Sequence, residues 1–176
     1  GLLAAVLYPH IAYVNAPSSG NGASAPDQVR LHIREHHAES TAPKVAHVHP
    51  SSVNNKVGGR DWLSPYVAFH ECFKTTKLYV RDCSPVPPLA LLLFAGEDID
   101  EDGDGLFVVD DWLQINVPHH TSHFVSEVRT RINALLYRTV VRAVNGGVNG
   151  DVNILGVDGE SELCVAVVAL LQVHVE

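Results

Sequence analysis

The fold is decided by the stretch Tyr66-Val-Ala-Phe-His-Glu-Cys-Phe-Lys-Thr-Thr-Lys-Leu-Tyr-Val-Arg-Asp-Cys83. Residues 66–73 and 78–83 are rich in β-branched and aromatic side chains, which fit the pleated surface of a β-strand. The polar segment Lys74-Thr75-Thr76-Lys77 lies between these two runs. We therefore predict two strands that are neighbours along the chain and are joined through this short connection.

A further strand is predicted at residues 28–35, where apolar and polar residues alternate. One face carries Val29, Leu31 and Ile33, and the other carries Arg30, His32 and Arg34. A period of two is typical of a strand with one buried and one wet face. Shorter strands are predicted at residues 11–14 and 44–49, and the pattern of the second does not fix its register.

The rest of the chain predicts helices and one more strand. Pro87 and Pro88 precede the apolar run 89–94, which suits a short buried helix that ends at Gly96. Residues 106–117 are predicted as the last strand. Residues 121–144 show helical periodicity and form the longest amphipathic helix. Residues 145–159 are a glycine-rich linker, and residues 161–173 are predicted as a second, shorter helix.

These elements predict a mainly β fold with helical additions. Five to six short strands interrupted by a small helix fit a Greek-key barrel like the oligonucleotide/oligosaccharide-binding (OB) fold, followed by one long and one shorter C-terminal helix. We expect residues 1–9 to end a preceding helical domain, residues 10–118 to form the barrel, and residues 119–176 to form the helical extension. With no initiating Met, the chain is expected to be part of a longer protein.

Charge is distributed unevenly along the chain. The formal net charge of −8 at pH 7 argues against binding of nucleic acid by bulk electrostatics. Residues 27–81 nevertheless hold eight Lys and Arg against five Asp and Glu, whereas residues 97–111 hold eight acids and no Lys or Arg. The two regions are therefore expected to face different partners.

Composition indicates an intracellular protein without a membrane span. The longest apolar run, Leu89 to Ala95, is far shorter than the roughly 20 residues that a span needs. The three cysteines (Cys72, Cys83 and Cys164) are odd in number and widely spaced, which favours a reducing compartment and buried thiols over disulfides. The nucleus, cytoplasm and mitochondrion are not distinguished.

The sequence lacks the common motifs of catalytic sites. It contains no phosphate-binding loop, dinucleotide fingerprint, nucleophile elbow or zincin motif, so no catalytic residue is assigned. Eleven histidines lack paired cysteines, and the acidic segment Asp98 to Asp104 has Val109 where a calcium loop needs a bidentate Glu. We therefore expect no metal site and no cofactor in this chain.

Several short motifs occur in a fixed order. They are Leu7-Tyr8-Pro9, His49-Pro50-Ser51-Ser52-Val53-Asn54, residues 74–83, residues 89–96, and Val109-Asp110-Asp111-Trp112-Leu113. In this combination the chain resembles the C-terminal OB-fold domain of DEAH-box and RNA helicase A-type ATP-dependent RNA helicases, from about residue 3 to residue 144. It departs at Ala95, where the family has Gly, and in the small-residue insert 15–26.

The resemblance implies an RNA-binding accessory domain that contacts single-stranded or structured RNA at the helicase channel and regulates unwinding. It also implies that the helicase core, with its ATP and magnesium, lies elsewhere in the same polypeptide. Lysines suit phosphates, short polar side chains suit 2′-hydroxyls or base edges, and rings can stack on unstacked bases. The expected contacts are His49, Ser51, Ser52, Asn54, Lys74, Thr75, Thr76, Lys77 and Tyr79.

Two alternatives stay open. Ser51 and Ser52 would instead cap a helical turn, and Tyr79 would pack in the barrel, whereas Val53, Leu78 and residues 91–94 are expected in the core. At the level of function, the alternative is a protein-interaction module. In that case the acidic segment 97–111 and the terminal helices would dock a helicase activator or an assembly partner.

Overall fold

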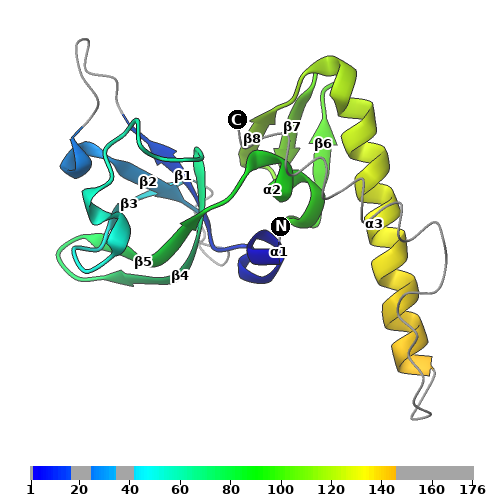
Figure 1. The fold of residues 1–176 in the computed structure, drawn as a ribbon, viewed down its shortest axis with the longest axis horizontal. Coiled ribbons are helices and arrows are strands. Elements are labelled where there is room, and N and C mark those ends of the chain that lie inside the picture. Colours follow the sequence, from blue (N-terminus) through cyan, green and yellow to red (C-terminus); the bar gives the residue numbers. More distant parts are fainter. Residues whose placement is uncertain (1, 17–24, 35–41, 146–176) are drawn as a thin grey trace.

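The computed structural model describes residues 2–16, 25–34 and 42–145, and it contains two packed units. Figure 1 shows a barrel built from β1 to β5 on one side and a smaller sheet with its helices on the other. The chain passes from the barrel to the smaller unit between β5 and α2. Each unit has its own apolar core.

The barrel is a closed sheet of five strands with the order β1-β2-β3-β5-β4. Its strands are β1 (Ile11–Asn15), β2 (Arg30–Ile33), β3 (Lys44–Val48), β4 (Tyr66–Lys74) and β5 (Leu78–Pro85), with the short 3₁₀ turns η1 (Pro26–Gln28) and η2 (Val53–Lys56) between them. β3 pairs with β5 in parallel, and the other four pairs are antiparallel. This arrangement confirms the predicted OB-like barrel, with five strands.

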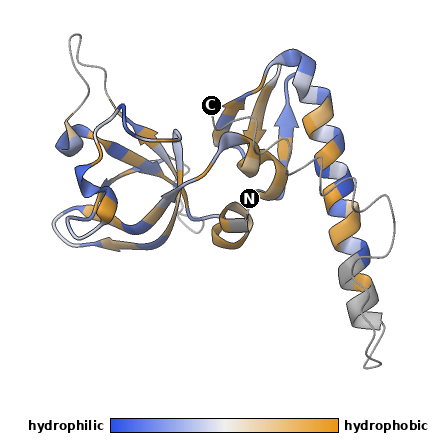
Figure 2. Cartoon of the chain, in the orientation of Figure 1, coloured by the Kyte–Doolittle hydropathy of each residue, from blue (hydrophilic) through white to orange (hydrophobic). Residues whose placement is uncertain are grey.

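The period of two in the sequence places one face of each strand inside the barrel. In β2, Leu31 and Ile33 are buried while Arg30 and His32 are half-buried on the outer face. Figure 2 shows the same alternation of apolar and polar residues across the barrel strands. The buried members form one cluster: Ala12, Val14, Val29, Leu31, Ile33, Ala46, Val67, Phe69, Val80 and Cys83. The polar outer face is therefore the surface that remains for a ligand.

The smaller unit packs helices on a three-stranded sheet with the order β6-β7-β8. Its elements are α1 (Leu2–Leu7), α2 (Pro88–Phe94), β6 (Ile99–Glu101), β7 (Leu106–Val109), β8 (Leu113–Asn116) and α3 (His119–Asn145). The predicted buried helix is confirmed, because residues 89–93 of α2 are all buried. They share one core with the sheet, the inner face of α3 and the outward-facing Tyr66 and Ala68 of β4.

The single strand predicted at residues 106–117 is wrong. The segment forms two antiparallel strands, β7 and β8, which lie outside the barrel. The chain reverses at Asp110 and Asp111, whose φ angles are 46° and 63°. Aspartate tolerates this left-handed backbone better than most residues, so the pair serves as a turn inside an otherwise strand-like pattern.

Other expectations have mixed outcomes. The long amphipathic helix is confirmed as α3, whereas the linker and the shorter second helix lie outside the described residues. Val53 was expected in the core but is 90% exposed, and Cys72 is exposed while Cys83 is buried. Among the described residues, no helix has the length and apolar character needed to cross a membrane.

Candidate nucleic-acid interface

The β4–β5 hairpin presents the predicted lysines to solvent. Lys74, Thr75, Thr76 and Lys77 are all exposed, and the Thr75 N–H donates a hydrogen bond to the Lys77 carbonyl at 2.9 Å, which closes the turn. Lys74 pairs with Leu78 at the end of the two strands. The hairpin thus carries two exposed lysines, one on each side of Thr75 and Thr76.

A cluster of four rings lies beside this turn. The His49 ring is 5.2 Å from Phe73 and 5.6 Å from Tyr79, measured between centroids, and Tyr79 is 6.3 Å from Phe73 and 6.1 Å from His47. All four are half-buried. The strands impose this arrangement, because Phe73 is opposite Tyr79 in the β4–β5 pair and His47 is opposite Tyr79 in the β3–β5 pair. Half-exposed rings of this kind suit base stacking.

Arg81 adds a guanidinium to the same face. Its Cζ atom lies 5.5 Å from the centroid of the Phe73 ring, and its Nη2 atom lies 3.2 Å from a carboxylate oxygen of Glu71. Tyr79 and Arg81 are two residues apart on β5, so both point away from the buried Val80. The cluster therefore combines aromatic faces with three cationic side chains.

Ser52 and Asn54 form hydrogen bonds with the backbone, and Ser51 contacts the His49 ring. The Ser52 hydroxyl caps η2 by accepting from the Asn54 N–H at 3.3 Å. The Asn54 side-chain amide donates to the Cys83 carbonyl at 2.6 Å, and the Ser51 hydroxyl lies 2.7 Å from Nδ1 of His49. Ser51 is exposed, whereas Ser52 and Asn54 are half-buried. The capping interpretation therefore applies to Ser52, and Ser51 helps to orient the His49 ring.

The pKa of His47 reflects the charges on the outer face of the barrel. Burial is the largest cause that lowers the pKa of His47, and the positive charges of Arg30 and Lys77 lower it further. Arg30 of β2 and Lys77 of the β4–β5 turn thus act on one imidazole. This convergence indicates a local positive potential on a chain whose net charge is negative.

Sequence reasoning missed Phe73, His47 and Arg81 as members of this face. The signal for Arg81 was present, because it shares the parity of Tyr79 on β5, whereas Phe73 has the parity of the buried Val67 and Phe69 on β4. His47 was harder to find, since it reaches Tyr79 only through the parallel pairing of β3 with β5. Pairing between distant strands is not encoded in local periodicity.

Two carboxylates of the acidic segment accept hydrogen bonds from nearby backbone N–H groups. The Asp102 carboxylate accepts the N–H groups of Asp104 and Leu106, and the Asp110 carboxylate accepts those of Glu97 and Asp98. Within the described ranges there is no group of three or more His, Cys, Asp or Glu that could hold a metal ion. The described carboxylates that make these bonds are therefore committed to the backbone.

The barrel with a ring-bearing outer face defines a class of protein. Residues 1–99, more than half of the chain, match the family model "Oligonucleotide/oligosaccharide-binding (OB)-fold". The chain belongs to this OB-fold family, whose domain is found in DExH-box helicases.

Individual relatives are helicases by name. The chain is 28% identical to mouse "ATP-dependent DNA/RNA helicase DHX36" over 79% of its own length and 13% of the relative's. It is 33% identical to mouse "Putative ATP-dependent RNA helicase DHX57" over 77% of its length and 10% of the relative's. It is 26% identical to Arabidopsis thaliana "DExH-box ATP-dependent RNA helicase DExH4, chloroplastic" over 58% and 7%. The chain thus spans about a tenth of the length of these relatives.

Proposed function

We propose that this domain binds single-stranded RNA on the outer face of its barrel, as an accessory part of an ATP-dependent helicase, and regulates unwinding there. The observation that carries the proposal is the contact of His49, Phe73 and Tyr79 beside the exposed Lys74 to Lys77 turn. Rings supply stacking energy that tolerates any base, and lysines follow the phosphates. ATP hydrolysis would then belong to the parts of the relatives that this chain does not match.

The family membership supports this proposal at the level of an accessory nucleic-acid-binding domain. Within the predicted set, the proposed direct contacts with the RNA strand are the exposed or half-buried Lys74, Thr75, Thr76, Lys77, Tyr79 and His49. Ser52 and Asn54 act through the backbone they hold, since their polar atoms already have protein partners. We therefore assign direct contact to the hairpin and the rings.

A titration of the 176-residue chain with labelled dodecauridine tests the assignment. Lys74→Ala and Lys77→Ala should each weaken binding and reduce the slope of log K against log salt by about 0.7 for each lost phosphate contact. Tyr79→Ala should weaken binding by about fivefold or more at every salt concentration, because stacking contributes roughly 1–3 kcal/mol per base. Fluorescence anisotropy at 50 and 200 mM salt measures both effects.

The matched control is Arg138→Ala, which removes one positive charge from an exposed site on α3. It should leave affinity and salt slope unchanged, and circular dichroism should show that every variant is folded. Equal losses in Arg138→Ala and Lys74→Ala would mean that binding follows total charge alone. Unchanged binding in all three hairpin variants would remove this face as the site.

Docking of a protein partner is the second candidate function. It is favoured by exposed apolar side chains on α3, where Phe124, Leu136 and Tyr137 are 42%, 53% and 72% exposed. Such residues are expected to be covered when they lie in an interface. If the hairpin variants do not alter RNA binding and Leu136→Ser abolishes capture of a helicase core domain from the same polypeptide, the docking function is the correct one.

A further inference from the structure

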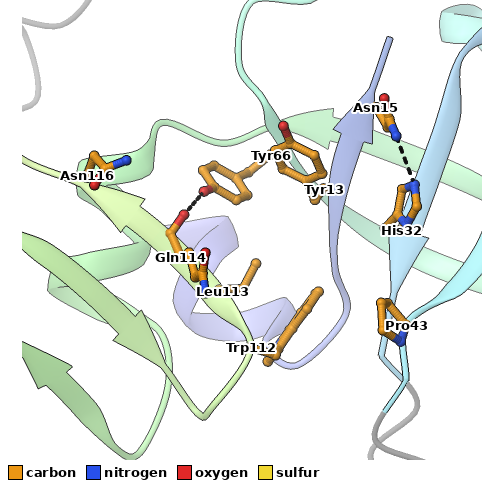
Figure 3. A pocket seen from close by; sticks show the side chains of 9 residues that line it. All are labelled: Tyr13, Asn15, His32, Pro43, Tyr66, Trp112, Leu113, Gln114 and Asn116. Carbon is orange, nitrogen blue, oxygen red and sulfur yellow. Dashed lines mark hydrogen bonds between the residues drawn. The ribbon is translucent and has the colours of Figure 1, made fainter. Parts of the chain in front are cut away.

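A groove lies between the outer face of the barrel and the smaller sheet. It has a volume of about 430 Å³, and Figure 3 shows the residues around it: Tyr13, Asn15, His32, Pro43, Tyr66, Trp112, Leu113, Gln114 and Asn116. These residues come from β1, β2, β4 and β8 and from the segments before β3 and β8. The volume falls in the range of small-molecule sites.

Aromatic rings form the barrel wall of the groove. Tyr13 pairs with Tyr66 on β4 and with His32 on β2, so the three side chains make one row across the outer face. The centroid of the Tyr13 ring lies 5.8 Å from that of Tyr66 and 6.4 Å from that of His32. Tyr13 is 44% exposed, whereas Tyr66 is buried and donates its hydroxyl to the Gln114 carbonyl at 2.6 Å. Tyr66 therefore fixes the wall, and Tyr13 offers a ring to a ligand.

The chemistry of the lining favours a neutral planar ligand. None of the described residues that line the groove is Lys, Arg, Asp or Glu, so the groove itself offers nothing suited to a phosphate. It offers instead the side-chain amides of Asn15, Gln114 and Asn116, of which Asn15 also contacts His32, with 3.2 Å between its Nδ2 atom and Nε2 of the ring. Amides provide both donors and acceptors, which can match the edge of a nucleobase. Trp112 lies across the groove from Tyr66 in Figure 3.

The groove also continues the face that carries the hairpin. Asn15 is the register partner of Arg30, and Arg30 acts electrostatically on His47, which is opposite Tyr79. The path from β5 through β3 and β2 to β1 crosses three inter-strand spacings of about 4.8 Å, or about 14 Å in total. A single strand that contacts Tyr79 would thus pass the guanidinium of Arg30 before it reaches the groove.

We infer that this groove is a second nucleobase-binding site, which receives a base of the same single strand that the hairpin holds, by stacking on Tyr13 and hydrogen bonding to an amide of the lining. The inference rests on the proposed function, that the barrel binds single-stranded RNA. Arg30 would neutralise a phosphate between the two sites. An aromatic side chain of a peptide is the competing occupant, and the lining amides and the flanking Arg30 favour the base.

Replacement of Tyr13 tests the groove separately from the hairpin. We would titrate the 176-residue chain with labelled dodecauridine, whose length lies within the roughly 4–16 nucleotides that an OB fold occupies. Tyr13→Ala should weaken dodecauridine binding by about fivefold or more, and Tyr13→Phe should restore it, because the phenyl ring keeps the stacking face. Tyr137→Ala is the matched control, a tyrosine that is 72% exposed on α3, and should have no effect.

A second readout reports on the groove directly. Dodecauridine should shift the side-chain amide NMR signals of Asn15 and Asn116 in the wild-type chain and leave them in place in Tyr13→Ala. Wild-type affinity in Tyr13→Ala, together with amide signals that do not shift in the wild-type chain, would overturn the groove site while leaving the hairpin site intact. Wild-type affinity in Lys74→Ala with a loss in Tyr13→Ala would overturn the hairpin site alone. Absence of RNA binding by the wild-type chain would overturn both.

Discussion

The side chain of Asn54 donates a hydrogen bond to the backbone carbonyl of Cys83 at 2.6 Å, across 29 positions of sequence. This bond joins the 3₁₀ turn η2, which follows His49, to strand β5, which carries Tyr79. The two segments that were predicted to contact RNA are therefore tied together by a residue that was itself predicted as a contact. We therefore expect Asn54 to position the rings.

Replacement of Asn54 should lower stability and weaken RNA binding indirectly. Asn54→Ala leaves a carbonyl of β5 without its donor, which costs about 1–3 kcal/mol of the free energy of unfolding. Urea denaturation measures this loss. Asn55→Ala is the matched control, because the neighbouring Asn55 is also half-buried and carries the same side chain. An equal loss in both variants would contradict the special role of the Asn54 bond.

The barrel could be predicted from sequence because its signal is local. The alternation of Arg30, Leu31, His32 and Ile33 fixes which side chains are buried, and the apolar run at 89–93 fixes α2. The hairpin of β7 and β8 could not be predicted as easily, since Asp110 and Asp111 reverse the chain within a strand-like pattern. The alternation of apolar and polar residues does not reveal that these two aspartates adopt a left-handed backbone.

The binding face was only partly predictable. Lys74 to Lys77 lie in a turn, where charged residues are readily recognised as exposed, and the structure places them there. The rings that meet Tyr79 come from two other strands, and the groove beside Tyr13 needs the smaller sheet as its second wall. Contacts of this kind depend on strand order and on packing between units, which a single sequence does not state.

The titration of His47 provides a test by pH. Its pKa in the folded chain lies below the unfolded value of about 6.5, so its contribution to stability is complete above pH 6.5 and is lost as the pH falls through the folded value. Bound phosphates would favour the imidazolium and raise this pKa, so RNA affinity should increase as the pH falls over the same window. NMR of the ring nitrogens, assigned with His47→Gln, follows the titration with and without dodecauridine.

The controls for His47 use neighbouring charges. Arg30→Ala and Lys77→Ala should raise the pKa of His47, because each removes a cation that disfavours the imidazolium. Lys56→Ala, which removes an exposed lysine from η2, should leave the titration unchanged. A His47 pKa that does not respond to dodecauridine would argue that phosphates do not approach this part of the barrel.

Gly105 and Gly103 provide a matched pair in the loop before β7. Both have positive φ angles, 95° and 83°, so alanine at either site costs about 1 kcal/mol of backbone strain. A Cβ atom at Gly105 would also lie 2.2 Å from the Val117 carbonyl oxygen, whereas one at Gly103 would meet nothing within 4 Å. Gly105→Ala should therefore lose roughly 1–3 kcal/mol more than Gly103→Ala in urea denaturation. Similar losses would mean that the backbone around Val117 relaxes easily.

Arg129 should be the residue of α3 whose replacement most loosens the smaller unit. Its guanidinium donates to the carbonyls of Leu92 and Ala95 at 2.7 Å and of Gly96 at 2.6 Å, so it satisfies the C-terminal end of α2. Burial lowers the pKa of Arg129, and the negative charge of Asp110 acts in the opposite direction. Arg129→Ala should cost about 3 kcal/mol of the free energy of unfolding. Arg129→Lys should recover only part of it, because an ammonium cannot reproduce the planar fork.

Arg131→Ala is the control for Arg129. Its side chain is 66% exposed and pairs with Glu127 one turn away, so its loss should cost less than about 0.5 kcal/mol. Thermal and urea unfolding of the three variants would rank them. If Arg129→Lys matched the wild-type chain, one charge near the end of α2 would suffice, through its interaction with the helix dipole. Full sensitivity to the lysine variant would instead assign the stability to the three directed hydrogen bonds.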